Sequence, residues 1–296
     1  MRCLVIGGTG LIGSSVLAAC ADRGYARLGT GYSAPESDMA PLDLRDADSI
    51  RELIADYQPD VTFLAAGPND AAVAETNPTR CKAIIAGGAA EVAAAVARIG
   101  GSVVLFSGDE VFGECPTARR EEDLVAPAGA LARAHAAAEA AVRERLPDRH
   151  LILRAGWAFG PDERLAGAVQ QWATAFAAGE RVDAATDRHG QPTYAPDLAE
   201  VAVELARLGH TGTVHAVGPD RQTAFTFARL AAHIFGHDTD LIAATEGDVS
   251  PRPKRVWLDR FKLRTLLGAR CIRGTADGLR AVRDYRTPAT PLRRAA

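Results

Sequence analysis

Two adjacent carboxylic acids, Asp109 and Glu110, follow a short apolar run and stand immediately before Val111-Phe112-Gly113. Neighbouring carboxyls of this kind can divide into a proton donor and a proton acceptor when burial separates their pKa values. Both residues are therefore candidates for acid/base catalysis. The alternative is that Asp109 caps a loop while Glu110 is solvated.

His135 lies in an alanine-rich stretch, one helical turn after Leu131 and on the same helical face. An imidazole exchanges protons near neutral pH, so His135 could shuttle a proton or contact ribose hydroxyls. The alternative is a histidine on the helix surface without a role. With Asp109 and Glu110, His135 completes the predicted set of catalytic residues.

Three further residues are weaker candidates. Cys115 could act as a nucleophile, although an inert thiol is the simpler interpretation. Trp157 could stack on a nucleotide base or pack in the core. Arg154 is expected to anchor the end of a strand rather than to perform chemistry.

A glycine-rich turn, Gly7-Gly8-Thr9-Gly10-Leu11-Ile12-Gly13, links the apolar run Cys3–Ile6 to a helical stretch. In such a GxxGxxG turn the first glycine allows a tight bend, the second lets backbone amides approach a pyrophosphate, and the third lets the helix pack on the strand. A merely tight strand-to-helix loop is the alternative. The predicted dinucleotide contacts in the turn are Gly7, Thr9, Gly10, Leu11, Ile12 and Gly13.

Strands and helices alternate after this turn, which predicts an α/β fold with a Rossmann-type doubly wound parallel sheet. The expected strands are residues 26–30, 61–65, 102–107 and 150–154, and the expected helices are residues 46–56, 78–99 and 129–146. A dinucleotide would lie across the carboxyl ends of the strands. Its other expected contacts are Asp43, Leu44, Ala65, Ala66 and Gly67, with Asp43 at the adenine edge. Residues 30–33 offer neither an acid for a ribose diol nor an arginine for a 2′-phosphate, so the cofactor is NAD or NADP.

The composition restricts the partners and the cellular setting. The 296 residues carry a formal net charge of −3, which argues against nucleic-acid binding. The five cysteines are widely spaced without a CxxC pair, so we expect free thiols in a reducing compartment and assign no metal site. No apolar run approaches the roughly 18 residues that a membrane span needs. We expect a soluble, cytoplasmic protein without a membrane partner.

A set of motifs resembles, in order and across almost the whole chain, the dTDP-4-dehydrorhamnose reductase family. The motifs are the glycine turn, Leu42-Asp43-Leu44, Pro59-Asp60-Val61, Ser107–Phe112, Leu153-Arg154, Trp157–Gly160, Gly190–Ala199 and Arg252-Pro253-Lys254. The stretch GQPTYAPDLA is the most specific of them. The resemblance implies an extended short-chain dehydrogenase/reductase fold, an NAD(P) site and a smaller C-terminal lobe for a nucleotide sugar or similar substrate. It implies a Rossmann domain over residues 1–155 and a substrate-binding lobe over residues 156–296, with part of about 193–217 returning to the Rossmann domain.

The same alignment of motifs exposes departures at the positions where this family keeps its catalytic residues. Gly108 stands at the family's threonine, Leu131 at its tyrosine and His135 at its lysine, and no tyrosine anywhere stands four residues before a lysine. Ile85 stands where the family usually has an asparagine that supports the lysine through water. A tyrosine phenol normally passes the proton in these reductases, and leucine cannot. Residues 109–113 instead resemble the Asp-Glu-Val-Tyr-Gly of nucleotide-sugar 4,6-dehydratases.

Three functions remain open from the sequence. The first is an enzyme that performs non-redox or atypical acid/base chemistry on a small-molecule or nucleotide-sugar-like substrate. The second is a non-catalytic NAD(P)-binding subunit that regulates a partner enzyme. The third is a reductase that uses another proton donor. A homodimer or a partner enzyme is the expected assembly.

Overall fold

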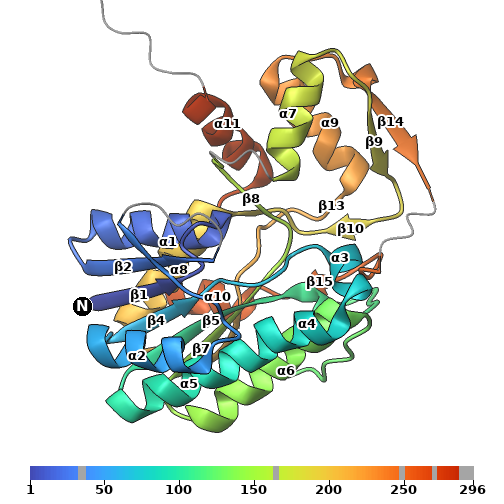
Figure 1. Cartoon of the computed structure of the whole chain (residues 1–296). Helices are drawn as coiled ribbons and strands as arrows, with labels where there is room; N and C mark the ends of the chain where they lie inside the picture. Colours follow the sequence, from blue (N-terminus) through green and yellow to red (C-terminus); the bar gives the residue numbers. More distant parts are fainter. Residues whose placement is uncertain (33–37, 163–166, 247–250, 269–271, 287–296) are drawn as a thin grey trace, which may run out of the picture.

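The computed structural model describes residues 1–32, 38–162, 167–246, 251–268 and 272–286. Seven parallel strands form a central sheet with the order β3-β2-β1-β4-β5-β7-β12 (Figure 1). The order reverses direction at β1 and β4, which is the doubly wound arrangement predicted from the sequence. The strands are β1 (Arg2–Ile6), β2 (Ala26–Gly31), β3 (Met39–Pro41), β4 (Val61–Leu64), β5 (Ser102–Gly108), β7 (His150–Ala155) and β12 (Gly212–His215).

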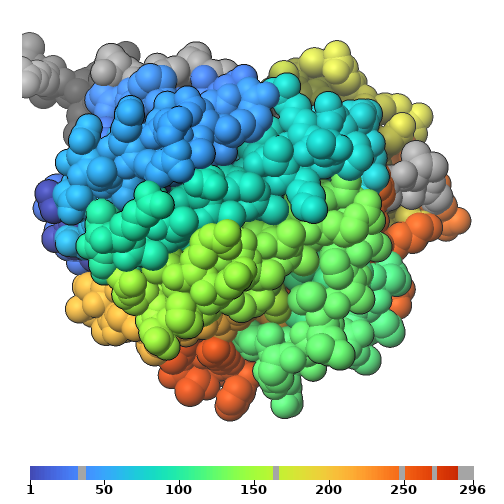
Figure 2. Space-filling view, turned by 60° about the horizontal axis from the view of Figure 1, so that its bottom comes forward, coloured from blue at the N-terminus to red at the C-terminus, as the bar shows by residue number. Residues whose placement is uncertain are grey.

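Helices cover both faces of the sheet. One face packs against α2, α5 and α6, with α3 and α4 beside α6, and the other packs against α1, α8 and α10. Figure 2 looks at the first of these faces, where the green and yellow-green segments that contain α5 and α6 lie side by side. The helices are α1 (Leu11–Asp22), α2 (Ala47–Tyr57), α3 (Ala71–Thr76), α4 (Pro78–Lys82), α5 (Gly88–Ile99), α6 (Ala130–Arg145), α8 (Ala195–Arg207) and α10 (Phe261–Leu267).

Local chemistry accounts for several of these boundaries. The Asp46 carboxylate accepts hydrogen bonds from the backbone N–H groups of Asp48 and Ser49, which fixes the start of α2. Gly100 ends α5 with a φ of +79°, a conformation that glycine adopts without strain. The helix expected over residues 78–99 is α4 and α5 joined by a π-helical turn, Ala83–Gly87.

A smaller lobe packs around its own apolar core, which includes Phe159, Phe176, Tyr194 and Phe227. In Figure 1 it lies beyond the carboxyl ends of the central strands. Its elements are α7 (Ala168–Ala177), α9 (Ala224–Phe235), α11 (Thr275–Arg286), β8 (Ala158–Phe159), β9 (Val182–Ala185), β10 (His189–Gly190), β11 (Thr193–Tyr194), β13 (Gln222–Thr223) and β14 (Ile242–Thr245), with a 3₁₀ turn at Thr239–Leu241. The pairs are β8–β11, β9–β14 and β10–β13. In addition, β6 (Ala118–Arg119) pairs with β15 (Trp257–Leu258).

No helix in the described part of the chain is both long enough and apolar enough to cross a membrane.

Candidate functional site

Two adjoining cavities open along the carboxyl ends of the central strands. The first, which we call the β2-side cavity, has a volume of about 370 Å³ and extends from the glycine turn to Tyr32 and Arg80. The second, the β5-side cavity, has a volume of about 540 Å³ and extends from the same turn to Asp109, Glu110 and His135. Both are lined by Thr9, Gly10, Ala65, Ala66, Gly67 and Pro68. A single elongated ligand could therefore contact both.

The glycine turn has the close packing that the sequence predicts. A Cβ built on Gly13 would lie 2.1 Å from the carbonyl oxygen of Gly7, so only glycine lets α1 approach the strand this closely. Gly7 has a φ of +91°, in the region that favours glycine. Gly10 precedes α1 without a side-chain cap, and Leu11 and Ile12 line the β5-side cavity. The first N–H groups of α1 thus form a suitable site for a pyrophosphate between the two cavities.

The β2-side cavity contains the other predicted dinucleotide contacts, Asp43, Leu44 and Ala65–Gly67. Both oxygens of the Asp43 carboxylate accept hydrogen bonds from the Arg45 side chain, at 2.6–3.1 Å. These bonds hold the pKa of Asp43 below its ordinary value. A carboxylate offers about four acceptor sites, which leaves room for a further donor, so the contact of Asp43 with the adenine edge stays a prediction. Arg45 and Arg80 also line this cavity and were not predicted from the sequence, because neither belongs to the strand-end segment that usually contacts the ribose.

Asp109, Glu110 and His135 come together in the β5-side cavity. A 3₁₀ turn, Asp109–Phe112, follows β5 and buries both acids, which are 7% and 3% exposed. The Nδ1 atom of His135 on α6 lies 2.5 Å from Oε1 of Glu110. The alternative of a solvated Glu110 is therefore wrong, and His135 is not an isolated surface histidine.

Arg252 is a fourth charged member of this cluster. Its Nη1 atom lies 3.6 Å from Oε2 of Glu110, and its Nη2 donates a hydrogen bond of 2.6 Å to the carbonyl oxygen of Asn69. Arg252 lies in one of the motifs that carry the family resemblance, but it was not predicted as a site residue. Only the folded chain shows that it reaches Glu110 from more than 140 residues away along the sequence.

Burial and charge separate the two acids. Burial, followed by the neighbouring charge of Glu110, raises the pKa of Asp109 to about 8. Burial also works against ionisation of Glu110, but the hydrogen bond and charge of His135, together with Arg252, hold its pKa well below the ordinary value. At neutral pH, Asp109 is therefore protonated and Glu110 is ionised. The site thus holds a proton donor beside a proton acceptor.

The side chain of Glu110 fills the space beside Gly108. A Cβ built on Gly108 would lie 2.2 Å from both carboxylate oxygens of Glu110. No rotation of a side chain at 108 can relieve that contact, because the Cβ position is set by the backbone. The buried position of Glu110 therefore requires a residue without a Cβ at 108.

The two apolar departures from the family motif belong to the hydrophobic core. Leu131 is 2% exposed and Ile85 is 5% exposed, and both pack in the cluster between the sheet and the helices α5 and α6. Leu131 does not line the β5-side cavity. Ile85 lies in the π-helical turn, where its Cγ1 atom would be 2.8 Å from a Cβ built on Gly67. Both positions are thus occupied by apolar side chains that pack in the core.

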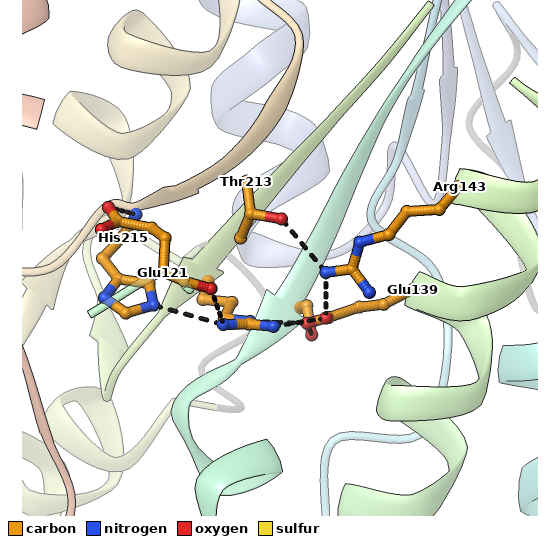
Figure 3. A network of polar contacts seen from close by, with 7 residues as sticks. Glu121, Glu139, Arg143, Thr213 and His215 are labelled. Atoms are coloured by element: carbon orange, nitrogen blue, oxygen red, sulfur yellow. Dashed lines mark hydrogen bonds and ion pairs between the residues drawn. The ribbon is translucent and has the colours of Figure 1, made fainter. Parts of the chain in front are cut away.

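A buried polar network lies behind the acid cluster (Figure 3). The Nε and Nη2 atoms of Arg154 donate hydrogen bonds of 2.9 and 2.7 Å to the two carboxylate oxygens of Glu139. Ser107 donates a hydrogen bond of 2.7 Å to Oε1 of the same carboxylate. Arg154 also lies 3.4 Å from Nε2 of His215, whose pKa burial and the charge of Arg154 lower to about 3. Arg154 anchors the strand, as expected from the sequence, and is not exposed to either cavity.

The remaining candidates have different surroundings. Trp157 lines the β5-side cavity and stacks on Phe227, with ring centroids 6.4 Å apart, so it both contacts the cavity and packs in the lobe. Cys115 is buried, its Sγ atom is 2.9 Å from the carbonyl oxygen of Thr117, and it lines neither cavity. Among the residues that the structure describes, no three His, Cys, Asp or Glu side chains gather as a metal ligand set.

Comparisons with known proteins agree with this fold. The family model described as the RmlD substrate binding domain matches residues 1–273. The chain is 30% identical over 279 residues to the probable low-salt glycan biosynthesis reductase Agl14 of Haloferax volcanii, covering 90% of this chain and 93% of that protein. It is 27% identical over 275 residues to methionine adenosyltransferase 2 subunit beta of Rattus norvegicus, covering 90% of this chain and 82% of that protein. The dTDP-4-dehydrorhamnose reductase of Bacillus anthracis in complex with NADP has the same fold, with a TM-score of 0.84 at 23% identity over 97% of this chain and 98% of that chain.

Proposed function

Because this chain belongs to the family of the RmlD substrate binding domain, we propose that it is an NAD(P)-binding enzyme performing acid/base chemistry on a small-molecule or nucleotide-sugar-like substrate. One observation carries the proposal. Two buried carboxyl groups, Asp109 and Glu110, and a histidine 2.5 Å from one of them line a single cavity that continues to the glycine turn, and their surroundings raise the pKa of Asp109 and lower that of Glu110. Such a combination is suited to proton transfer beside a bound dinucleotide.

The chain's own residues fit NAD or NADP. The uncapped start of α1 suits the pyrophosphate, and the glycine turn leaves the space that it needs. Leu44, Ala65, Ala66 and Gly67 would hold the adenosine portion. When bound, the nicotinamide supplies hydride transfer. The NADP in the related Bacillus anthracis structure supports this assignment.

Asp109 is the proposed proton donor and the pair of Glu110 and His135 is the proposed acceptor. Asp109 holds a proton at neutral pH and can give it to a substrate oxygen or leaving group. Glu110 can accept a substrate proton and share it with His135 across their 2.5 Å contact. The guanidinium of Arg252, 3.6 Å from Glu110, offsets the second negative charge that forms when Asp109 gives up its proton.

Solvent deuterium tests this proposal, because it reports proton transfer to the substrate whatever product is formed. The protein is incubated in D₂O with NAD(P) and a panel of dTDP- and UDP-linked 4-keto sugars, and deuterium incorporation is followed by NMR and mass spectrometry. We expect incorporation or turnover with the native chain. Asp109→Asn, Glu110→Gln and His135→Ala should reduce the rate, with at least one variant lower by about 10²-fold. Rates that are unchanged in all three variants would rule out the acid/base assignment.

A non-catalytic regulatory subunit is the second candidate. The apolar packing at Leu131 and Ile85 favours it, as does the similarity to a protein named as a subunit of methionine adenosyltransferase. In that case the chain binds NAD(P) and a partner enzyme, and the partner's rate changes. The three variants at the acid cluster would then leave dinucleotide binding and partner binding unchanged.

A reductase with another proton donor is the third candidate, and the relative named as a glycan biosynthesis reductase favours it. Asp109 or His135 would then supply the proton in place of tyrosine. We expect ordinary reduction of dTDP-4-keto-6-deoxysugars to be slower by about 10²–10⁴-fold than in a relative with tyrosine and lysine. Oxidation of NAD(P)H in step with sugar reduction, measured at 340 nm, would favour this third function over the first.

A further inference from the structure

We propose that the β2-side cavity contains a subsite for the 2′-phosphate of NADP(H), formed by Arg45 and Arg80. The inference rests on the proposed function, because it assumes that a dinucleotide lies along the strand ends. It adds the choice of cofactor and the residues that determine it. Neither arginine was expected at the site from the sequence.

Arg45 is held at the carboxyl end of β2. Its Nη2 donates a hydrogen bond of 3.2 Å to the hydroxyl of Tyr32, the residue that follows the strand. In doubly wound folds the ribose next to adenine lies at this strand end, and a nearby arginine accommodates a 2′-phosphate. Arg45 therefore lies where the extra phosphate of NADP would be.

The guanidinium of Arg45 keeps donors for such a phosphate. Its Nε and Nη2 atoms are used by Asp43 and Tyr32, whereas the two N–H groups on Nη1 have no partner among the residues described in the structure. An arginine has five N–H donors in a planar fork. The contacts with Asp43 thus orient the fork and leave the two N–H groups of Nη1 available.

Asp43 does not cancel the positive charge of this cavity. Its ionised carboxylate is matched by Arg45, and Arg80 on α4 adds a second cation that also lowers the pKa of Asp43. Arg80 is exposed, lines the same cavity, and has no ion-pair partner in the described part of the chain. Two arginines against one aspartate favour a dianionic phosphate.

The described part of β2 supplies no competing acid. An enzyme that selects NAD usually places an aspartate or glutamate at this strand end to accept from the ribose hydroxyls. Here the strand ends Gly29-Thr30-Gly31 and Tyr32 follows. The buried Thr30 hydroxyl accepts a hydrogen bond from the N–H of Gly7. The local chemistry therefore favours the phosphorylated ribose.

Nucleotide fragments isolate the 2′-phosphate from the rest of the cofactor. Binding of adenosine 2′,5′-bisphosphate, adenosine 3′,5′-bisphosphate and adenosine 5′-monophosphate to the full chain is measured by calorimetry, with NADPH and NADH in parallel. We expect the 2′,5′-bisphosphate and NADPH to bind about tenfold more tightly than the monophosphate and NADH. Arg80→Ala and Arg45→Ala should each remove most of this preference and change monophosphate binding by less than about threefold.

Arg51→Ala is the matched control. Arg51 lies on α2, pairs with Asp48 and lines neither cavity, so its loss should leave the preference intact. Equal or tighter binding of NADH would overturn the inference and leave the proposed function standing. A 3′,5′-bisphosphate bound as tightly as the 2′,5′ isomer would also overturn it. Failure of every nucleotide to bind would overturn the dinucleotide site itself.

Discussion

Because Gly108 has no side chain, the carboxylate of Glu110 can occupy the space beside it. The carboxylate of Glu110 lies where a residue with a Cβ at 108 would project, and it reaches His135 from there. The contact between Glu110 and His135 therefore depends on glycine at 108. Restoring the family's residues at 108, 131 and 135 together would leave Glu110 in conflict with the new side chain at 108.

Gly108→Ala tests this coupling. We expect the new methyl group to displace Glu110, break its contact with His135, and reduce the free energy of unfolding by about 1–3 kcal/mol. The pKa of Glu110 should rise toward its ordinary value, because the hydrogen bond and charge of His135 hold it down in the native chain. Carboxyl ¹³C NMR measures the pKa and urea unfolding measures the stability. Gly87→Ala is the control, since a Cβ there meets only one atom, at 4.0 Å. If the pKa of Glu110 were unchanged in Gly108→Ala, the coupling would be contradicted.

Asp109→Asn tests the raised pKa of Asp109. The folded chain keeps the Asp109 proton up to about pH 8, whereas the ordinary carboxyl releases it near 3.8. The folded state binds more protons than the unfolded state in this window, so native stability falls as the pH rises from about 4 to 8. Asparagine does not ionise, and the variant should be more stable than the native chain at pH 9 by about 1–3 kcal/mol.

At pH 4 the native chain and Asp109→Asn should differ by less than about 1 kcal/mol, because a large part of the Asp109 carboxyl is then neutral in the unfolded state as well as in the folded state. Thermal unfolding at both pH values gives the comparison. Asp148→Asn, at an exposed position, is the control. A variant that is less stable than the native chain at pH 9 would show that Asp109 is ionised and stabilising there.

The sequence identified the acids and the histidine because they lie in or beside recognisable motifs. It did not identify Arg45, Arg80 or Arg252 as site residues. Each of them reaches a cavity from a segment other than the strand end beside which its side chain lies, and spacing along the chain does not indicate such contacts. Nor could the sequence show that Glu110 turns into the space beside Gly108.

The start of α6 depends on another helix. Gly129 provides no side-chain cap for α6, and the carboxylate of Glu75 on α3 accepts the hydrogen bond from the backbone N–H of Ala130. A carboxylate at this end also interacts favourably with the helix dipole. Since α6 carries His135, α3 helps to set the position of a residue in the acid cluster.

Glu75→Ala should lower the free energy of unfolding by about 1 kcal/mol, the usual loss for a helix cap. Glu75→Gln keeps a neutral acceptor and should lose less. Urea unfolding followed by circular dichroism measures both variants. Glu52→Ala, an exposed position on α2, provides the comparison, and equal losses at 52 and 75 would exclude a capping role.

The longer elements could be predicted from the sequence and the shorter ones could not. Strands β2, β4, β5 and β7 and helix α6 lie within about two residues of their expected bounds, because apolar runs and helical periodicity are strong signals over such lengths. The π-helical turn Ala83–Gly87 interrupts the expected helix without any proline or break in its apolar pattern. Two-residue strands such as β8 and β11 have no periodicity to detect, and their pairing depends on the lobe as a whole.

At the scale of the whole molecule, the Arg154–Glu139 pair joins segments that are distant in sequence. Glu139 on α6 bonds to Ser107 at the end of β5, to Arg154 on β7 and to Arg143, while Arg143 reaches Thr213 on β12 (Figure 3). Ser107 lies two residues before Asp109, and Glu139 lies one helical turn after His135. The pair therefore fixes the strand and the helix that carry the acid cluster.

Breaking this pair should destabilise the whole fold, because either partner left alone is a buried, uncompensated charge. Arg154 and Glu139 are 2% and 1% exposed, so Arg154→Met and Glu139→Gln should each lower the free energy of unfolding by about 3–5 kcal/mol. Arg143→Ala is the control, since its side chain is 39% exposed and its loss should cost no more than about 1 kcal/mol. Chemical unfolding followed in parallel by far-UV circular dichroism and tryptophan fluorescence measures each variant.

The double variant Arg154→Met/Glu139→Gln separates a buried charge from lost packing. Removing both charges should recover part of the stability lost in either single variant, because no ion is then left buried without a partner. Burial opposes ionisation of Glu139, but hydrogen bonds from Arg154 and Ser107 hold its pKa below the ordinary value. Protonation of Glu139 breaks the pair, so the native chain should begin to unfold as the pH falls below the ordinary range of glutamate. A double variant with the summed losses of both single variants would show that the pair stabilises the fold through its packing and not through the matching of two charges.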